Sequence, residues 1–333
     1  MMIQRKSKLC DNQTIMSISF QAARRRLPED LLMRLQSEYS QPLMEKILRG
    51  FMEERHTVLR VNTLKATVRD ILEDLQKQAV QVQRIPVFPE AIVLKNRREN
   101  WVESWNAYTD GRIYLQGLSS QMPVLFLNPQ PGDKVLDMTA APGSKTTQIA
   151  AAMNNQGEIL ANELNEIRHE RLKFNLERQG VLIAQTRLGD GAQIGSEKPA
   201  YFDKILLDAP CSAEGRIQVS SGRSFAFWSE KNIREHARLQ RRLLRSAYEA
   251  LKTGGILVYS TCTLAQEENE LMVDWFLKNY KDMTLQPLRL EFPHLLPVVT
   301  TDFVKPDVCI KASPSALCEG FFIARFHKLK ETS

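Results

Sequence analysis

The sequence predicts an α/β protein: a doubly wound sheet in its larger, carboxyl-terminal part, preceded by a smaller α+β module. From Pro131 onward, short apolar runs that are typical of buried strands alternate with segments of helical periodicity. That alternation is the order expected of a mostly parallel sheet with helices on both faces. Before residue 115, the strand and helix signals do not alternate in this way. With 333 residues, 43% of them hydrophobic, the chain is long enough for one large and one smaller domain.

Three parts are expected along the chain. Residues 1–55 form a polar, helical amino-terminal segment, residues 56–115 form the α+β module, and residues 116–333 form the domain that contains the sheet. Within the module, the hydrophobic pattern predicts one helix at 68–78 and strands at 58–61, 80–85 and 92–94. No long Gly/Ser linker separates the module from the sheet, so the two are expected to pack together.

The elements of the sheet domain follow from apolar runs for the strands and from helical spacing for the helices. The predicted strands are residues 134–138, 158–162, 184–188, 205–207, 256–258 and 321–326. The predicted helices are residues 145–153, 167–179, a long helix closed by Gly254-Gly255, and 267–279.

Two cysteines directly follow predicted strands. Cys211 comes after the apolar run 205–207, and Cys262 comes after 256–258. Ligands of open parallel sheets bind beyond the carboxyl ends of the strands, and neighbouring strands lie roughly 4.8 Å apart. The two thiols therefore converge if these strands are neighbours. A lone cysteine is often a small apolar core residue, but polar residues surround both thiols, which favours a paired-thiol active site.

The loop after the first strand of the sheet is rich in small residues and opens a helix, as in sites that bind a ligand at a helix amino terminus. It is not a P-loop, because Met138 stands where the first glycine should be, and it is not a dinucleotide loop, because only Gly143 is present. Glu163 ends the second strand, where it can accept hydrogen bonds from ribose hydroxyls, and Asp190 follows the third, where it can accept from an adenine amine. These features favour a nucleoside cofactor without a polyphosphate, and S-adenosylmethionine is the natural candidate.

The charge is distributed unevenly. The net charge is +6, and residues 216–245 alone contain eight basic and two acidic residues. Further basic residues lie at 24–26 and at 97–98, close to Trp101 and Trp105. Guanidinium groups bind phosphates and exposed aromatic rings stack on bases, so a nucleic-acid partner is favoured over a merely solvated helix face.

The sequence also lacks the signals of several classes of protein. It has no run of 18 apolar residues and no apolar segment behind a basic start, so we expect a cytoplasmic protein without a membrane partner. Its five cysteines form no C-x-x-C pair, so neither a disulfide framework nor a metal site is expected. Cys10, Cys309 and Cys318 are interpreted as structural or incidental. The protein is expected to be a monomer.

These motifs resemble the RNA 5-methylcytosine methyltransferases of the RsmB/NOP2/Sun family, which includes the bacterial 16S rRNA enzymes RsmB and RsmF. The resemblance covers about four fifths of the chain, and the motifs at 259–270 and 318–325 are most similar to RsmF. It runs through Arg60-Val61-Asn62, the loop at 136–146, Asp208-Ala209-Pro210-Cys211-Ser212, Tyr259-Ser260-Thr261-Cys262, Glu267-Glu268-Asn269-Glu270 and Cys318-Glu319-Gly320-Phe321-Phe322. Two departures are Ala213, where the family usually has glycine, and Gly117, where an acidic residue is common.

The resemblance implies a class I methyltransferase sheet of seven strands, the last antiparallel, after an RRM-like RNA-binding module. It also implies a nucleophile, Cys262, and a second cysteine, Cys211, associated with release of the methylated product. The residues that it places around S-adenosylmethionine are Thr139, Ala140, Ala141, Pro142, Gly143, Ser144, Lys145, Glu163, Arg168, Asp190 and Asp208.

The chemistry explains why two thiols are needed. C5 of cytosine is too weak a nucleophile to take a methyl group, so a thiolate must first add to C6, which is covalent catalysis. A free thiol has a pKa of about 8.5, so the site must lower it or supply a base, and Lys145 is placed to help. Asp208 is expected to hold the ring at N3 and N4, with its carboxyl protonated or bridging the amine.

The target base must leave its stack to reach the site. Residues 216–245 are expected to grip the flanking backbone, with rRNA as the expected substrate and tRNA as the alternative. Phe225, Phe227 and Trp228 are candidates either for stacking on a base or for core packing.

Three other interpretations stand beside this one. DNA cytosine methyltransferases attack with a Pro-Cys thiol, which would make Cys211 the nucleophile. Exocyclic-amine methyltransferases carry an aromatic residue where Cys211 stands, so that class is set aside. A non-catalytic ribosome-assembly factor would bind RNA with the same fold, but it would not need both thiols.

Overall fold

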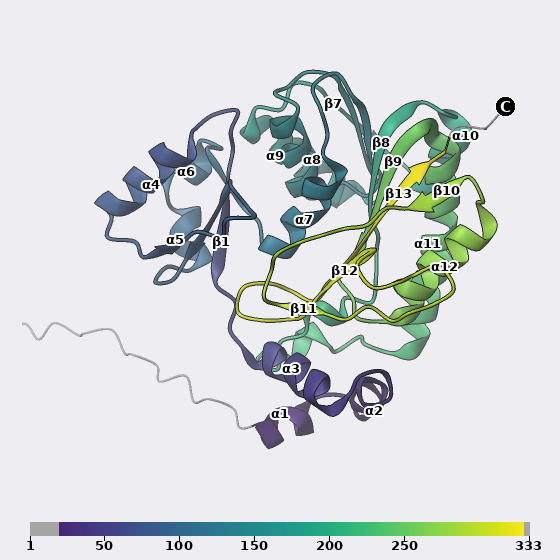
Figure 1. Cartoon of the computed structure of the whole chain (residues 1–333). Helices are drawn as coiled ribbons and strands as arrows, with labels where there is room; N and C mark the ends of the chain where they lie inside the picture. The colour runs from purple at the N-terminus through teal and green to yellow at the C-terminus, as the bar shows by residue number, and fades with distance from the viewer. Residues whose placement is uncertain (1–19, 330–333) are drawn as a thin grey trace, which may run out of the picture.

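The structure is a computed structural model, and it describes residues 20–329. Three helices begin the described chain, α1 (Phe20–Arg26), α2 (Glu29–Glu38) and α3 (Gln41–Met52), and they lie beneath the rest of the protein in Figure 1. Leu31, Ile47 and Phe51 are buried in a cluster with Ile217 and Leu264 of the sheet domain. The predicted helical start is confirmed over these residues, whereas Cys10 lies outside the described part of the chain.

The module contains one antiparallel sheet in the order β2-β3-β1-β4. Its strands are β1 (Thr57–Val61), β2 (Val82–Gln83), β3 (Ala91–Leu94) and β4 (Ile113–Leu115). Its helices are α4 (Val68–Lys77), α5 (Glu99–Glu103) and α6 (Asn106–Thr109). The predicted strand at 80–85 is too long, because only Val82 and Gln83 pair with β3 and Pro86 follows.

The large sheet is doubly wound and has the order β11-β12-β13-β9-β8-β5-β6-β7, with β10 paired to β13. Strand β13 runs antiparallel to its neighbours β9 and β12, as the resemblance implied for the last strand. Seven strands form the expected core of the sheet, and the short β10 and β11 bring the total to nine. The bounds are β5 (Lys134–Asp137), β6 (Glu158–Glu163), β7 (Ala184–Leu188), β8 (Phe202–Asp208), β9 (Leu251–Thr261), β10 (Met283–Leu285), β11 (Leu295–Leu296), β12 (Cys309–Ala312) and β13 (Phe321–Lys328).

Helices cover both faces of this sheet (Figure 1). The helices of the domain are α7 (Leu118–Leu127), α8 (Ser144–Ala152), α9 (Glu166–Gln179), α10 (Ile194–Glu197), α11 (Glu230–Ala250) and α12 (Glu270–Asn279). Successive residues of β8 alternate between the two cores: Ile205 and Leu207 pack with α11 and α12, whereas Leu206 packs with α7 and α8. Among residues 20–329, no helix is both long and apolar enough to cross a membrane.

Two predicted helix boundaries are wrong. The long helix ends at Ala250, four residues before Gly254, because Leu251 already pairs with Phe202 as the start of β9. The predicted helix at 267–279 begins three residues later, at Glu270. The preceding residues form a 3-10 turn, and the side chain of Asn269 binds Thr261 and the backbone of Thr263 instead of facing solvent.

Candidate active site

The two thiols meet at the carboxyl ends of neighbouring strands. β8 and β9 are parallel and paired, with Asp208 opposite Ser260, so Cys211 and Cys262 leave the sheet side by side. Their Sγ atoms lie 3.3 Å apart, and the backbone N–H of Cys262 donates to Cys211 Sγ, also at 3.3 Å. The predicted convergence of the thiols is therefore confirmed.

The environments of the two thiols differ. The hydrogen bond with Cys262, together with burial, raises the pKa of Cys211 well above its ordinary value. Cys262 lines a cavity of about 330 Å³, and Cys211 is not among the residues of its wall. Cys262 is thus the thiol of the pair that a ligand in the cavity meets.

A charged pair stands beside Cys262 in the same cavity. Lys145 Nζ lies 2.7 Å from Asp208 Oδ2 and donates to Ser120 Oγ at 3.0 Å. Ser260 Oγ donates to the other carboxylate oxygen of Asp208 at 2.7 Å. Burial lowers the pKa of Lys145, but the attraction of Asp208 outweighs burial and the net shift is upward. Lys145 is therefore a cation at neutral pH and not a base.

The small-residue loop joins β5 to α8 and forms one wall of this cavity. Gly143 has φ +105° at the amino-terminal cap of α8, a conformation that glycine adopts without steric cost. Thr139 Oγ1 donates to the Asp208 carbonyl at 2.8 Å, which joins the loop to the end of β8. Beneath it, Thr146 Oγ1 donates to Asp137 Oδ2 at 2.7 Å, and burial raises the pKa of Asp137 to about 6.

Glu163 ends β6 with a buried carboxylate. Its Oε1 accepts from the backbone N–H groups of Leu164 and Asn165 at 3.0 and 2.9 Å. Its Oε2 accepts no hydrogen bond from residues 20–329 and faces Arg168 at 3.4 Å. Arg168 also donates to the Ala141 carbonyl at 2.8 Å, so its side chain connects the acidic strand end to the loop. An acceptor of this kind suits the hydroxyl groups of a ribose.

Asp190 lies one strand further along, beyond β7. Its Oδ1 accepts from the backbone N–H of Ala192 at 2.9 Å, which caps the following turn, and its Oδ2 pairs with Arg242 at 2.9 Å. Neither Asp190 nor Glu163 lines the 330 Å³ cavity itself. The predicted set therefore divides into a group around the cavity and these two acids, which follow the next two strands of the sheet.

Arg216 and Glu319 also line the cavity, and they were not predicted as site residues. Arg216 Nε lies 3.3 Å from Glu319 Oε1, and this carboxylate raises the pKa of the guanidinium. Gly215 and Gly320 bring their two segments together: Gly320 N–H donates to the Gly215 carbonyl at 2.9 Å, and Gly215 N–H donates to the Cys262 carbonyl at 3.0 Å. In the sequence, Arg216 belongs to the basic run and Glu319 to the motif at 318–322, but neither pattern indicated that the two side chains would meet.

The amino-terminal module contacts the same loop through a buried guanidinium. Arg60, in the middle of β1, donates to the Ser144 carbonyl at 2.7 Å, to Gln116 Oε1 at 2.9 Å and to Thr147 Oγ1 at 2.9 Å. Burial lowers the pKa of Arg60 to about 10. The expectation that module and sheet pack together is confirmed by these contacts.

The structure separates the candidate stacking aromatics. Phe225 and Trp228 are partly buried against the hydrophobic cluster that α1–α3 form with the sheet domain, and Trp228 Nε1 donates to Glu214 at 2.8 Å. Phe227 is 87% exposed. On α11, the basic side chains at 234, 238, 241 and 245 are exposed. Core packing thus accounts for Phe225 and Trp228, and only Phe227 of the three is free to stack.

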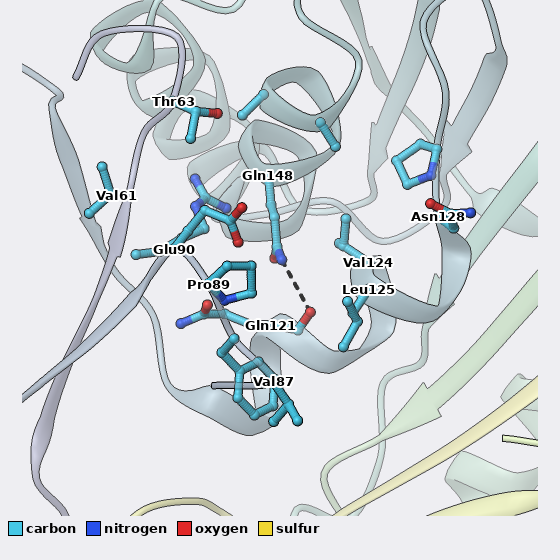
Figure 2. A pocket seen from close by; sticks show the side chains of 15 residues that line it. Val61, Thr63, Val87, Pro89, Glu90, Gln121, Val124, Leu125, Asn128 and Gln148 are labelled. Atoms are coloured by element: carbon cyan, nitrogen blue, oxygen red, sulfur yellow. Dashed lines mark hydrogen bonds between the residues drawn. The ribbon is translucent and has the colours of Figure 1, made fainter. Parts of the chain in front are cut away.

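A second cavity, of about 190 Å³, lies between the module and helices α7 and α8. Figure 2 shows Gln148 reaching across it to the Gln121 carbonyl, with Pro89 and Val87 of the module opposite Leu125. Its walls contain none of the predicted site residues.

Comparison with known families gives matches over most of the chain. The family model for 16S rRNA methyltransferase RsmB/F matches residues 124–327, and the model for the RsmF/B-like ferredoxin-like domain matches residues 27–99. Ribosomal RNA small subunit methyltransferase F of Escherichia coli O139:H28 is 40% identical over 278 residues, 81% of this chain and 56% of that protein. The chain spans about half the length of the curated relatives that it matches.

Two solved structures from Pyrococcus horikoshii are also similar. A methyltransferase homologue superimposes with a TM-score of 0.75 at 34% identity, covering 91% of this chain and 100% of that one. NSun6, solved with the S-adenosylmethionine analogue SFG, gives a TM-score of 0.78 at 25% identity, covering 92% and 99%.

Proposed function

Because the chain belongs to the 16S rRNA methyltransferase RsmB/F family, we propose that it transfers a methyl group from S-adenosylmethionine to C5 of a cytosine in RNA, with 16S rRNA as the expected substrate. The fold is that of the class I S-adenosylmethionine-dependent methyltransferases, and S-adenosylmethionine is the cofactor of the family. The observation that carries the proposal is the thiol pair at 3.3 Å, with Cys262 in the cavity wall beside the cofactor loop.

In the proposed reaction, Cys262 adds to C6 of a flipped-out cytosine, and electron density moves to C5. The cofactor, when bound, supplies an electrophilic methyl group that C5 accepts. A proton then leaves C5, and the bond between Cys262 and C6 breaks to restore the ring. Cys211 lies within contact distance of Cys262, so it is placed to assist this last stage, in which the methylated product is released.

Asp208 and Lys145, the charged pair next to the thiols, also have roles in this proposal. The carboxylate of Asp208 faces the cavity and accepts from Ser260 and Lys145, which hold it in one orientation. We assign it the polar edge of the cytosine, where the N4 amine donates to the carboxylate and where N3 is bound once a proton lies between N3 and the carboxyl. Lys145 supplies positive charge close to the thiols and the ring, which favours the negative charge that develops as the thiolate adds.

The cofactor is assigned to the loop 139–145 and the three strand ends beside it. The polar groups present fit such a ligand: backbone N–H groups at the start of α8, a buried carboxylate oxygen of Glu163 without a hydrogen-bond partner among residues 20–329, and Asp190 beyond the next strand. The guanidinium of Arg168 lies 3.4 Å from Glu163 Oε2, so we propose that the Arg168 side chain shifts when a ribose hydroxyl binds this carboxylate.

The RNA is assigned to the module at 56–115 and to the exposed basic face of α11. The exposed arginines on α11 follow the Cys211 loop and the exposed Phe227 in sequence, and they offer cations to the phosphates of a bound backbone. We propose three parts: a helical amino-terminal segment at 1–55, the RNA-binding module at 56–115 and, at 116–333, the domain that performs the transfer.

A covalent-trapping experiment tests the roles of the thiols. With labelled S-adenosylmethionine and RNA, Cys211→Ala is expected to accumulate a covalent RNA adduct, and Cys262→Ala is expected to form none. The reverse pattern would make Cys211 the nucleophile. Binding of S-adenosylmethionine without transfer to any RNA would support a non-catalytic binding protein instead.

The substrate is tested separately, by bisulfite sequencing of rRNA and tRNA from a strain that lacks the gene. Loss of a single 5-methylcytosine from 16S rRNA is the expected result. Loss of a tRNA site would replace rRNA by tRNA with the chemistry unchanged.

A further inference from the structure

A buried carboxylate holds the loop that carries Cys211. Glu268 lies in the 3-10 turn before α12 and is fully buried. Its two carboxylate oxygens accept from the backbone N–H of Ser212 at 3.1 and 3.3 Å. Ser212 directly follows Cys211, so this contact fixes the loop next to the thiol.

A second side chain joins the carboxylate to the other side of Cys211. Gln240 of α11 is fully buried, and its Nε2 donates both to Glu268 Oε2 and to the Pro210 carbonyl, each at 2.8 Å. The residues before and after Cys211 are therefore bound to one Glu268–Gln240 unit. The Tyr259 hydroxyl donates to the Glu268 carbonyl at 2.6 Å, which holds the backbone of the turn in place.

The contacts of Glu268 go to the Cys211 loop and not to the cavity. Cys262 lines the cavity and is held from another direction, by Gly215 N–H on its carbonyl. Neither Glu268 nor Gln240 lines the cavity, so neither meets substrate or cofactor there. Ser212 Oγ also lies 2.7 Å from Thr263 Oγ1, next to Cys262, so a change at Glu268 should act first on Cys211 and less on Cys262, whose carbonyl is held by Gly215.

A carboxylate is a costly choice for such a position. Removing a carboxylate from water is unfavourable unless several donors compensate. Burial raises the pKa of Glu268 to about 7. The N–H of Ser212 requires an acceptor at this point, and an apolar residue would leave it unpaired.

We infer that Glu268 is a positioning residue for Cys211: through Ser212 and Gln240 it holds the Cys211 thiol against Cys262, and in doing so it sets the rate of product release. This inference rests on the proposed function for the release step. The orientation of the thiol, however, can be measured without any reaction on RNA.

The first test compares Glu268→Gln with Glu267→Gln, a matched control on the neighbouring residue. Glu267 pairs with Arg34 and does not contact the Cys211 loop. Diamide oxidises two adjacent thiols to a disulfide, taking one hydrogen from each sulfur. Wild type and Glu267→Gln are expected to form the Cys211–Cys262 disulfide rapidly, read as a linked peptide and a loss of two hydrogens in intact mass. Glu268→Gln leaves one acceptor oxygen for the two donors, Ser212 N–H and Gln240 Nε2, and places an amide NH2 group against them, so in this variant the rate is expected to fall about tenfold. Equal rates in all three proteins would overturn the inference.

The second test follows turnover and adduct together. Glu268→Gln is expected to lower turnover about tenfold while the rate of adduct formation by Cys262 stays within about twofold, so that adduct accumulates as in Cys211→Ala. An equal loss in both rates would indicate a merely structural role and would overturn the inference. Gln240→Leu removes the other half of the unit and is expected to act in the same direction, which covers the case of a poorly folded Glu268 variant. If Cys211→Ala itself accumulates no adduct, the proposed release role fails, while the disulfide rates still decide what holds the thiol.

Discussion

Substitution of Gly215 by alanine tests the contact that closes one side of the cavity. A Cβ at Gly215 would lie 2.0 Å from the Gly320 carbonyl oxygen, 2.5 Å from its carbon and 2.7 Å from its Cα. All three atoms belong to backbone, so no side chain can rotate away, and the two segments must separate by about 1 Å or more to reach ordinary contact.

The cost follows from what this separation breaks. Overpacking of a close contact costs about 1–3 kcal/mol. The hydrogen bonds from Gly320 to Gly215 and from Gly215 to the Cys262 carbonyl lengthen at the same time, and each contributes about 1 kcal/mol. Because the two hydrogen bonds are weakened and not lost, we count about half of each, and we expect Gly215→Ala to lower the free energy of unfolding by about 2–4 kcal/mol. It should also slow adduct formation, because the displaced segments carry Arg216 and Glu319 of the cavity wall.

Urea unfolding followed by circular dichroism measures the first effect, and covalent trapping of RNA measures the second. Gly222→Ala is the control, because no atom lies within 4 Å of a Cβ at that position. We expect its stability to stay within about 0.5 kcal/mol of wild type. A Gly215→Ala protein that is as stable as this control and traps RNA at the wild-type rate would refute the reasoning.

Three further predictions follow from single residues. Ala213 has φ +59°, where an alanine is strained, so Ala213→Gly is expected to raise the free energy of unfolding by about 0.5–1 kcal/mol in urea titrations; an unchanged or lower value would contradict the assigned strain. Burial raises the pKa of Asp137 to about 6 in the folded protein, above its unfolded value near 3.9, so its contribution to stability is present below pH 3.9 and is lost as the pH rises through 6. Between pH 4 and pH 7.5, the free energy of unfolding of Asp137→Asn should therefore rise by about 2 kcal/mol relative to that of wild type, as measured in unfolding titrations. Burial raises the pKa of Cys309 and of Cys318, so mass-mapped labelling with N-ethylmaleimide at pH 7.5 should modify Cys262 before these two thiols, and early labelling of Cys309 would contradict the packing of β12.

The parts of the fold that sequence could predict are those in which burial is uniform. The strands at 134–138, 158–162 and 205–207 each contain a short apolar run, because the middle of each strand lies in the interior of the sheet, and the structure confirms them. Strand β12 was not predicted, because a lysine interrupts its apolar pattern. A lysine usually indicates an exposed position, but Lys311 is fully buried and pairs with Glu270 at 3.0 Å. Helix α7 was missed as well, and it contains Pro123.

The candidate site divides in the same way. A thiol or an acid directly after a strand has a position that sheet geometry fixes, so the meeting of Cys211 with Cys262 could be predicted. Arg216 and Glu319 reach the cavity because two glycines remote in sequence touch, and no local pattern encodes such a contact. Likewise, the resemblance marked Glu268 as part of a motif, but the partner that explains it, Ser212, lies 56 residues away.

The position of Arg60 has a consequence for engineering. The guanidinium of Arg60 on the amino-terminal module completes the hydrogen bonds of Ser144 and Thr147 in the domain that follows, and Asn62, directly after β1, donates to the Gln179 carbonyl at the end of α9. The two parts are therefore joined by buried hydrogen bonds at the base of the loop 136–146. A chimaera that exchanged residues 56–115 for the module of another enzyme would inherit unmatched donors and acceptors at this seam. If RNA binds α11 as proposed, substrate range is thus more accessible to point changes on the exposed face of this helix than to exchange of whole modules.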